Sequence, residues 1–178
     1  MKQTRVRSTY NIFIEEYPFH QKLKEELVPL LEKYPDKQER KTNVKATMTE
    51  WKWNSDNDRV KRLKSCITEQ VSSYFKYNPV ENNIPMSLEC FSFWSNIYHK
   101  GDYTITHKHG PRSIFSFVYF LKTKWYHPPF VFTDSGKRIS PKEGTYVLFP
   151  SHLMHHVPVN RFKETRITLS GNLKLKGL

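Results

Sequence analysis

The stretch MSLECFSFWSNIYHKGDYTITHKH, residues 86–109, marks a change in the sequence from helical patterns to strand-like patterns. Residues 86–99 alternate without a helical period, and the run 102–109 alternates as well. Successive side chains of a strand point to opposite faces, so a period of two indicates β-strands. Gly101 separates the two runs and is typical of a turn. The stretch therefore predicts two strands joined by a tight connection.

The rest of the chain towards the C-terminus continues the strand pattern. The run SIFSFVYFL, 113–121, is continuously apolar, as expected for a strand that is buried on both faces. Further short candidate strands follow, separated by turn residues, at 129–134, 144–150, 152–159 and 165–173. Six or seven short strands of this kind predict a sandwich or a jelly-roll barrel.

The N-terminal part has a different pattern of apolar residues. It predicts a short strand at 9–19 followed by two amphipathic helices. The first helix is predicted at 20–34, and its apolar face is formed by Leu23, Leu27, Leu30 and Leu31. The second is predicted at 56–77, capped by Asp56 or Asn57, with an apolar stripe formed by Val60, Leu63, Ile67, Val71 and Phe75. Residues 35–50 are polar and are expected to form a loop.

These patterns predict one domain, residues 1–178, of the α+β class with mainly β structure. Its first part, 1–84, contributes a strand and a helical layer that packs on one sheet, and 85–178 form the β core. A chain of this length is large enough to bury a substantial core. Aromatic residues make up 15% of the sequence, which favours bulky packing between strands.

The composition restricts the possible partners and the compartment. The formal net charge of +12 suits nucleic acid, an acidic protein or an anionic small molecule, although the charge is spread along the chain. Cys66 and Cys90 are too few for a disulfide framework, so free thiols and a cytoplasmic location are expected. The first residues are polar and no apolar run is long enough to span a membrane, so no membrane partner is expected.

Histidines form the first chemical signal. His107 and His109 are two residues apart on a predicted strand, so both imidazoles point to the same side. Histidine is the commonest side-chain ligand of transition metals, but one such pair is weak evidence for a metal site. A jelly roll brings distant strands together at its mouth, and His155 on a later strand could then complete a set of three.

The last predicted strand carries the second signal. In TRITLSGNL, 165–173, one face is polar, and Ile167 and Leu169 lie on the other. The polar face contains Arg166, Thr168, Ser170 and Asn172. This face is either solvated or lines a pocket, in which Arg166 can form paired hydrogen bonds to a carboxylate and Thr168 can add a hydroxyl.

The order of these residues resembles a known family. His107-Lys108-His109, a distal His155, and Arg166 followed two residues later by Thr168 resemble the pattern of the Fe(II)/2-oxoglutarate-dependent oxygenases. The run NIYHKGDYTITHKH also resembles the corresponding stretch of AlkB-type dealkylases in that superfamily. The runs 94–121 and 143–173 are similar to 2-oxoglutarate/Fe(II) oxygenases of marine T4-like cyanophages. The resemblance covers roughly residues 85 to 173 and is less sharp before them.

The resemblance implies a fold, cofactors and residue roles. The family fold is a double-stranded β-helix of the jelly-roll, cupin-like kind, in agreement with the strand count. His107 and His155 would bind Fe(II), and Arg166 would bind the distal carboxylate of 2-oxoglutarate. The residues that would assist in binding 2-oxoglutarate are Thr168, Asn96, Tyr98 and Tyr119. The family chemistry consumes dioxygen and converts 2-oxoglutarate into succinate, with ascorbate as a helper in vitro.

His109 departs from the family pattern, because the usual set of ligands is two histidines and one carboxylate. Three explanations stay open. In the first, His109 is the third ligand. In the second, Asp134 supplies the missing carboxylate. In the third, the site is degenerate and the domain is structural. The sequence thus predicts a metal set of His107, His109 and His155, with Asp134 as the alternative third ligand.

The expected function is that of a 2-oxoglutarate-dependent dioxygenase, a hydroxylase that acts in the cytoplasm (the host cytoplasm for a viral protein). Its partners would be 2-oxoglutarate and an undetermined substrate: a protein side chain, an amino acid, another small molecule, or nucleic acid in view of the basic charge. Two alternatives remain: a non-catalytic jelly-roll module of a phage, and a three-histidine dioxygenase that needs no keto acid.

Overall fold

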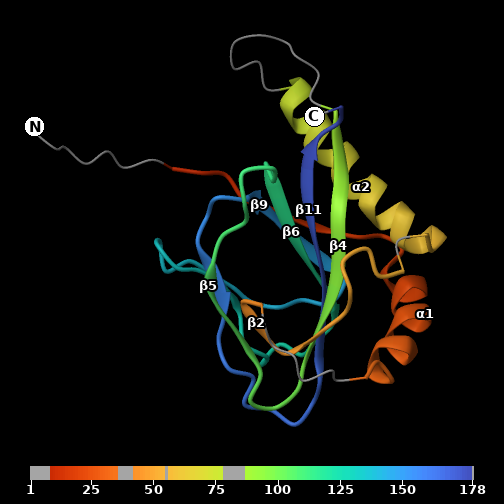
Figure 1. The fold of residues 1–178 in the computed structure, drawn as a ribbon, viewed down its shortest axis with the longest axis vertical. Helices are drawn as coiled ribbons and strands as arrows, with labels where there is room; N and C mark the ends of the chain where they lie inside the picture. Colours follow the sequence, from red (N-terminus) through yellow and green to blue (C-terminus); the bar gives the residue numbers. More distant parts are fainter. Residues whose placement is uncertain (1–8, 36–41, 55, 78–86, 178) are drawn as a thin grey trace, which may run out of the picture.

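The structure is a computed structural model that describes residues 9–35, 42–54, 56–77 and 87–177, and of residues 74–77 only the backbone. Two antiparallel sheets form the body of the molecule, and two helices cover one of them (Figure 1). The larger sheet consists, in spatial order, of β1 (Phe13–Glu16), β9 (Thr145–Pro150), β6 (Phe115–Lys122), β11 (Arg166–Leu175), β4 (Leu88–Tyr98) and β3 (Thr47–Met48). The smaller sheet consists of β2 (Val44–Lys45), β5 (Tyr103–His107), β10 (His155–Val157), β7 (Phe130–Phe132) and β8 (Arg138–Ile139).

The helices α1 (His20–Glu32) and α2 (Asp58–Tyr77) pack on the outer face of the larger sheet (Figure 1). Their predicted apolar stripes are buried at Leu23, Leu27, Leu31, Val60, Leu63, Ile67 and Val71. Leu30 is the exception, because it is 52% exposed on the side of α1 that faces away from the sheet. The side chain of Phe75 lies outside the described residues. The oxygen Oδ1 of Asn57 accepts the backbone N–H groups of Arg59 and Val60, so Asn57 caps α2.

A second core lies between the two sheets. It joins inward-facing side chains of the larger sheet with those of the smaller one, and its buried members include Tyr98, Val118, Phe120, Val147, Phe149, Phe130, Phe132 and Val157. The strand β11 is central to the larger sheet, since it pairs with β4 on one side and β6 on the other. Its residues Ile167, Leu169 and Leu173 belong to the helix-side core, so the polar side chains that alternate with them face the other sheet. Of the two possibilities that the sequence left open, the polar face is therefore the inward one.

The mainly β class with helices on one sheet is confirmed, but two local expectations were wrong. The segment 35–50 is not a continuous loop, because β2 pairs with β5 and β3 pairs with β4. The strand β8, which pairs with β7, had no counterpart in the sequence patterns. Each of these strands has two residues and pairs at the edge of a sheet. Two residues are too few to show the alternating pattern of a strand.

The cysteines and the helices bear on the expectations from the composition. Cys66 and Cys90 are both free. Burial raises the pKa of the Cys90 thiol to about 12, so this thiol stays protonated at neutral pH. No helix in the described part of the chain is long and apolar enough to cross a membrane.

Candidate active site

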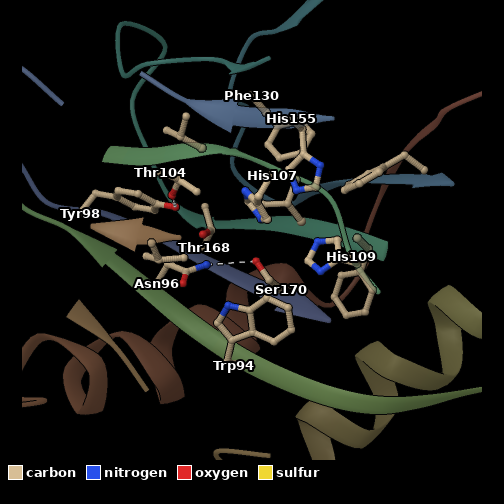
Figure 2. Close-up of a pocket in the computed structure, with 15 residues that line it drawn as sticks. Trp94, Asn96, Tyr98, Thr104, His107, His109, Phe130, His155, Thr168 and Ser170 are labelled. Atoms are coloured by element: carbon tan, nitrogen blue, oxygen red, sulfur yellow. Dashed lines mark hydrogen bonds between the residues drawn. The ribbon is translucent and has the colours of Figure 1, made fainter. Parts of the chain in front are cut away.

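A cavity opens between the two sheets and receives side chains from both (Figure 2). It encloses about 410 Å³ of space, counted with its open mouth. Its polar lining residues are Trp94, Asn96, Tyr98, Thr104, His107, His109, His155, Thr168 and Ser170. Apolar side chains such as Val118, Phe130 and Phe149 form the remaining walls. Small-molecule sites usually combine apolar walls with converging polar groups, and this cavity has both.

Three histidines meet at one end of this cavity. His107 ends β5 and pairs in register with His155, the first residue of β10, while His109 follows β5 by two residues. The ring centroids of His107 and His155 are 4.3 Å apart, and that of His109 lies 5.3 Å and 5.1 Å from them. One nitrogen from each imidazole lies within 4.8 Å of the others. The structure therefore brings together the three residues that the sequence singled out for metal binding.

Hydrogen bonds fix the orientation of two of these rings. The Nδ1–H of His107 donates to the carbonyl of Ile105 at 2.9 Å, and the Nδ1–H of His155 donates to the carbonyl of Leu153 at 2.8 Å. A carbonyl oxygen can only accept, so Nδ1 carries the proton in both neutral rings and Nε2 keeps its lone pair. Backbone carbonyls fix metal-binding histidines in this way in many proteins.

Burial keeps the three imidazoles neutral. It lowers the pKa of His109 to about 4, with a further contribution from His107, and it lowers the pKa of His155 well below its ordinary value. The pKa of His107 is lowered for the same reason, although its bond to the carbonyl of Ile105 opposes the shift. Neutral imidazole is the form that binds metals.

The donor set suits a divalent transition metal. Imidazole nitrogens bind iron, nickel, copper and zinc at about 2.0–2.1 Å, which places neighbouring ligand atoms about 3 Å apart. Small side-chain rotations from the present separations would reach that geometry. Two of the three rings are already oriented by carbonyls, so the cluster fits a metal ion.

Arg166 is the second unusual feature of the inner face. It begins β11, it is fully buried, and none of its three guanidinium nitrogens has a hydrogen-bond partner among the described residues. Its neighbours are the rings of Tyr98 and Phe120, whose centroids lie 4.9 Å and 5.6 Å from the guanidinium carbon. Burial lowers the pKa of Arg166. The hydroxyl of Tyr98 opposes that shift, since it lies close enough to act on the guanidinium although no hydrogen bond of good geometry joins the two groups, and a guanidinium remains charged. A buried cation without a partner is costly, so this position calls for an anion.

Other polar groups lie along the same face. Thr168 is two residues after Arg166, and its buried Oγ1 also lacks a partner within the described part of the chain. The Nδ2 of Asn96 donates to Ser170 Oγ at 3.1 Å, while Asn96 Oδ1 has no partner there (Figure 2). A hydrogen bond of 2.8 Å joins the hydroxyls of Tyr98 and Thr104. Arg166 and Thr168 thus offer free donors for an anionic ligand.

Two predicted site residues do not join this group. Tyr119 is fully buried on the helix side of β6, where its hydroxyl bonds His20 Nδ1 at 2.6 Å, so its assignment to the keto-acid pocket is corrected. The apolar residues Phe115, Phe117, Tyr119 and Leu121 of β6 belong to the helix-side core, whereas Val118 and Phe120 belong to the core between the sheets. Asp134 is exposed in the turn after β7 and is outside the histidine cluster. His156 also points away from the cavity, and its Nδ1 bonds Thr133.

Trp94 is a lining residue that the sequence reasoning did not assign to the site. Its ring lies 6.2 Å from that of His109 and 4.5 Å from the exposed ring of Trp51. Its buried Nε1–H has no acceptor among the described residues. The sequence could have indicated this position, because Trp94 is two residues before Asn96 on the same strand and therefore lies on the same face.

Comparison with known families and sequences gives a partial match. Residues 131–172 match the family model described as "Putative 2OG-Fe(II) oxygenase". This segment contains His155, Arg166 and Thr168 and begins after His107 and His109. No curated protein sequence matches the chain.

Solved structures extend the similarity to the whole fold. The viral collagen prolyl hydroxylase of Paramecium Bursaria Chlorella virus-1, in a 2-oxoglutarate complex, is 13% identical with a TM-score of 0.68, covering 92% of this chain and 95% of that one. A prolyl-4-hydroxylase of Pseudomonas putida is 15% identical with a TM-score of 0.67, covering 94% of each chain. HygX of Streptomyces hygroscopicus, with nickel and 2-oxoglutarate bound, is 9% identical with a TM-score of 0.68, covering 96% of this chain and 85% of that one. These similarities show that the chain has the fold of 2-oxoglutarate oxygenases.

Proposed function

We propose that the protein is an Fe(II)- and 2-oxoglutarate-dependent dioxygenase that hydroxylates a protein side chain, an amino acid or another small substrate. The observation that carries this proposal is the combination of two features on one inner face. A cluster of three neutral histidines fits a metal, and a fully buried, unpaired Arg166 fits a carboxylate. A keto acid with two carboxylates can engage both features at once.

The residues have separate roles in this proposal. His107, His109 and His155 hold the metal through imidazole nitrogens, and the carbonyls of Ile105 and Leu153 keep two of the rings in the binding tautomer. Arg166 and Thr168 bind the distal carboxylate of 2-oxoglutarate, with Asn96 and Tyr98 as neighbouring polar groups. Bound Fe(II) and 2-oxoglutarate would supply the chemistry, in which dioxygen converts the keto acid into succinate and carbon dioxide and oxidises a substrate C–H bond.

Part of the cavity wall beside the histidines is apolar. Val118, Phe130 and Phe149 form apolar walls beside the histidines. A dry environment strengthens the attraction between Arg166 and a carboxylate, and it protects reactive species from side reactions.

The substrate is the open part of the proposal. Two of the similar structures are prolyl hydroxylases, so a prolyl peptide is the first substrate to test. The net charge of +12 favours an acidic protein segment over a neutral one. An amino acid, another small molecule and an alkylated base follow as further candidates.

A dioxygenase that needs no keto acid is the rival enzyme, because three histidines without a carboxylate would suit it. The buried guanidinium of Arg166 favours the keto-acid reading. Without a bound anion, the three guanidinium nitrogens have no hydrogen-bond partner among the described residues, which costs free energy in a low-dielectric interior. An enzyme that needs no keto acid would have no use for this buried cation.

The decisive experiment is the release of succinate from 2-oxoglutarate by purified protein with Fe(II), ascorbate and dioxygen. We expect turnover in the wild type, loss of it in His107→Ala, and a loss of at least about tenfold in kcat/KM for 2-oxoglutarate in Arg166→Met, which removes charge-assisted hydrogen bonds. His156→Ala is the matched control, because this neighbouring histidine points out of the cavity. Equal traces of succinate from wild type and His107→Ala would refute the proposal. A rise in melting temperature with Mn(II) and 2-oxoglutarate supports it independently.

A further inference from the structure

Three loops meet at the end of the molecule where β11 begins (Figure 1). They are the turn 99–102 after β4, the loop 123–129 after β6 and the loop 158–165 before β11. The buried residue Asn160 joins the first to the third, because its backbone N–H donates to the carbonyl of Asp102 at 2.8 Å and its carbonyl accepts the N–H of Gly101 at 2.7 Å. The rings of Tyr126 and Phe162, whose centroids are 4.7 Å apart, join the second to the third. The outer sides of the three loops therefore form one surface, the loop surface.

Aromatic side chains are exposed on the loop surface. Trp125 is 84% exposed, more than any other large apolar side chain in the described part of the chain. Its ring centroid lies 5.5 Å from that of Tyr126, and Phe162 beside them is 37% exposed. Exposed apolar side chains that gather on one surface, with polar groups around them, mark a site of interaction.

Positive charge surrounds these rings. The exposed cations are Lys100, Lys124, Arg161 and Lys163. No ion pair joins any of them to an acidic side chain among the described residues. Two carboxylates oppose them. Glu164 is exposed and its charge acts on the hydroxyl of Tyr126, whereas Asp102 is buried and accepts the backbone N–H of His99. The loop surface therefore carries an excess of positive charge even with both carboxylates counted.

Hydrogen bonds hold the backbone of this surface in place. The side chain of Asn160 accepts the N–H of Phe162 through Oδ1 and donates to the carbonyl of Glu164 through Nδ2, both at 3.3 Å. The Nδ1 of the buried His127 accepts the N–H of Lys124 at 3.0 Å, and its ring lies 6.0 Å from that of Phe162. The segments that carry the rings are thus ordered before a partner arrives, which lowers the entropy cost of binding.

We propose that the loop surface binds a single-stranded nucleic acid, with bases stacked on Trp125 and its neighbouring rings and with phosphates held by the four cations. Stacking and phosphate contacts are the interactions by which proteins hold single strands without sequence preference. The net charge of +12 adds attraction at longer range. None of these residues lines the histidine cavity, so this inference is independent of the proposed function.

The order of residues on the loop surface favours a nucleic acid over other polyanions. Each exposed ring has a cation as its direct neighbour, as in Lys124-Trp125 and in Arg161-Phe162-Lys163. A strand of nucleotides combines flat rings and charges in the same interleaved way. An acidic peptide would use the cations and leave the ring of Trp125 in water. A membrane-binding surface separates its apolar side from its basic side, whereas here the two are mixed.

The test is fluorescence anisotropy of labelled oligonucleotides of about 15 nucleotides, which is within the usual site size. The probes are oligo-dT, oligo-U and a DNA duplex of the same length, and the ratio of the first two distinguishes DNA from RNA. We expect a single strand to bind at least about tenfold more tightly than the duplex, which hides its base faces. Trp125→Ala should weaken that binding at least about fivefold, as for the loss of one stacked base. Lys163→Gln should reduce the slope of log affinity against log salt by about 0.7, since one phosphate contact is lost.

The matched controls lie outside the three loops. They are Trp51→Ala, which removes another exposed tryptophan, and Lys137→Gln, which removes another exposed lysine. Both should leave the affinity nearly unchanged. Equal losses in Trp125→Ala and Trp51→Ala, equal affinity for single strand and duplex, or no binding at all would overturn the inference.

Two further probes identify the other possible partners. Binding of poly-glutamate, or of vesicles of phosphatidylcholine and phosphatidylserine, that depends on Trp125 while single strands do not bind would also overturn the inference. The partner would then be an acidic polypeptide or a membrane. Succinate release by the wild type without nucleic acid measures the proposed function separately, so either can fail while the other stands.

Discussion

The buried histidines of the cavity give the metal-free protein a definite dependence of stability on pH. The folded state lowers the pKa of His107, His109 and His155 from 6.5, in the case of His109 to about 4. Between pH 7 and pH 5 the unfolded chain takes up more protons at these positions than the folded chain does. Since the unfolded state then binds more protons, the free energy of unfolding must fall as the pH falls.

Urea unfolding of the metal-free protein at pH 7, 6 and 5 measures this effect. We expect the free energy of unfolding to decrease steadily over this range, and His109→Asn to show a smaller decrease because one titrating group is gone. The lowered pKa values of His20 and His127 act in the same direction and remain in the variant. A stability that is constant or rises towards pH 5 would contradict the neutral state assigned to the cluster.

Single residues also show how far sequence reasoning reaches. Arg166 and Thr168 could be placed on one face because β11 alternates between polar and apolar residues, but the alternation alone did not show whether that face is solvated or lines a pocket. Tyr119 could not be placed, because β6 is apolar on both faces and its sequence carries no sign of which face is the cavity. The convergence of the three histidines depends on the pairing of β5 with β10, which no local pattern reveals.

Among the elements, α2 depends on a cap that the sequence left ambiguous between Asp56 and Asn57. Asn57 accepts two backbone N–H groups, whereas Asp56 is exposed. Asn57→Ala should therefore lower the free energy of unfolding by about 1 kcal/mol, the usual loss for such a cap. Chemical denaturation measures it, with Asp56→Ala as the control that should change little. The reverse ranking would assign the cap to Asp56.

The central strand β11 has a position that only glycine can occupy without rearrangement. A Cβ at Gly171 would lie 2.5 Å from the buried ring of Phe117 and 3.0 Å from the carbonyl of Ser92. Gly171→Ala should lower the free energy of unfolding by about 1–3 kcal/mol, because the core around Phe117 must shift. Gly110→Ala is the matched control, since a Cβ there meets nothing within 4 Å. Equal melting temperatures for both variants would contradict this packing.

At the scale of the whole molecule, the larger sheet separates a stabilising face from a binding face. Tyr119 lies on the helix side and bonds His20, while Thr168 lies on the cavity side with an unpaired hydroxyl. Tyr119→Phe should lower the free energy of unfolding by about 1 kcal/mol and leave 2-oxoglutarate affinity unchanged. Thr168→Val should do the opposite, weakening 2-oxoglutarate binding several-fold at nearly constant stability. Thermal melts with and without Mn(II) and 2-oxoglutarate check both, and loss of affinity in Tyr119→Phe would contradict the separation.

The architecture as a whole was the most predictable level. The eight strands other than β2, β3 and β8, and both helices, were expected from the sequence patterns, since these elements are long enough to show a pattern or an apolar run. The edge strands β2, β3 and β8 could not be predicted from the sequence, because two residues cannot show an alternating pattern. The sequence also left open which group completes the metal set, since a cluster of this kind is defined by distances across strands rather than by spacing along the chain.

The pairing of His107 with His155 has a consequence for how the chain reaches this state. These residues are far apart in sequence, and β1 pairs with β9 across a still longer stretch of chain. Such non-local pairings form slowly and late, because loops must close before the contacts that stabilise them exist. We therefore expect the histidine cluster to form late in folding. A metal would accordingly slow the unfolding of the finished protein and do little to speed its folding.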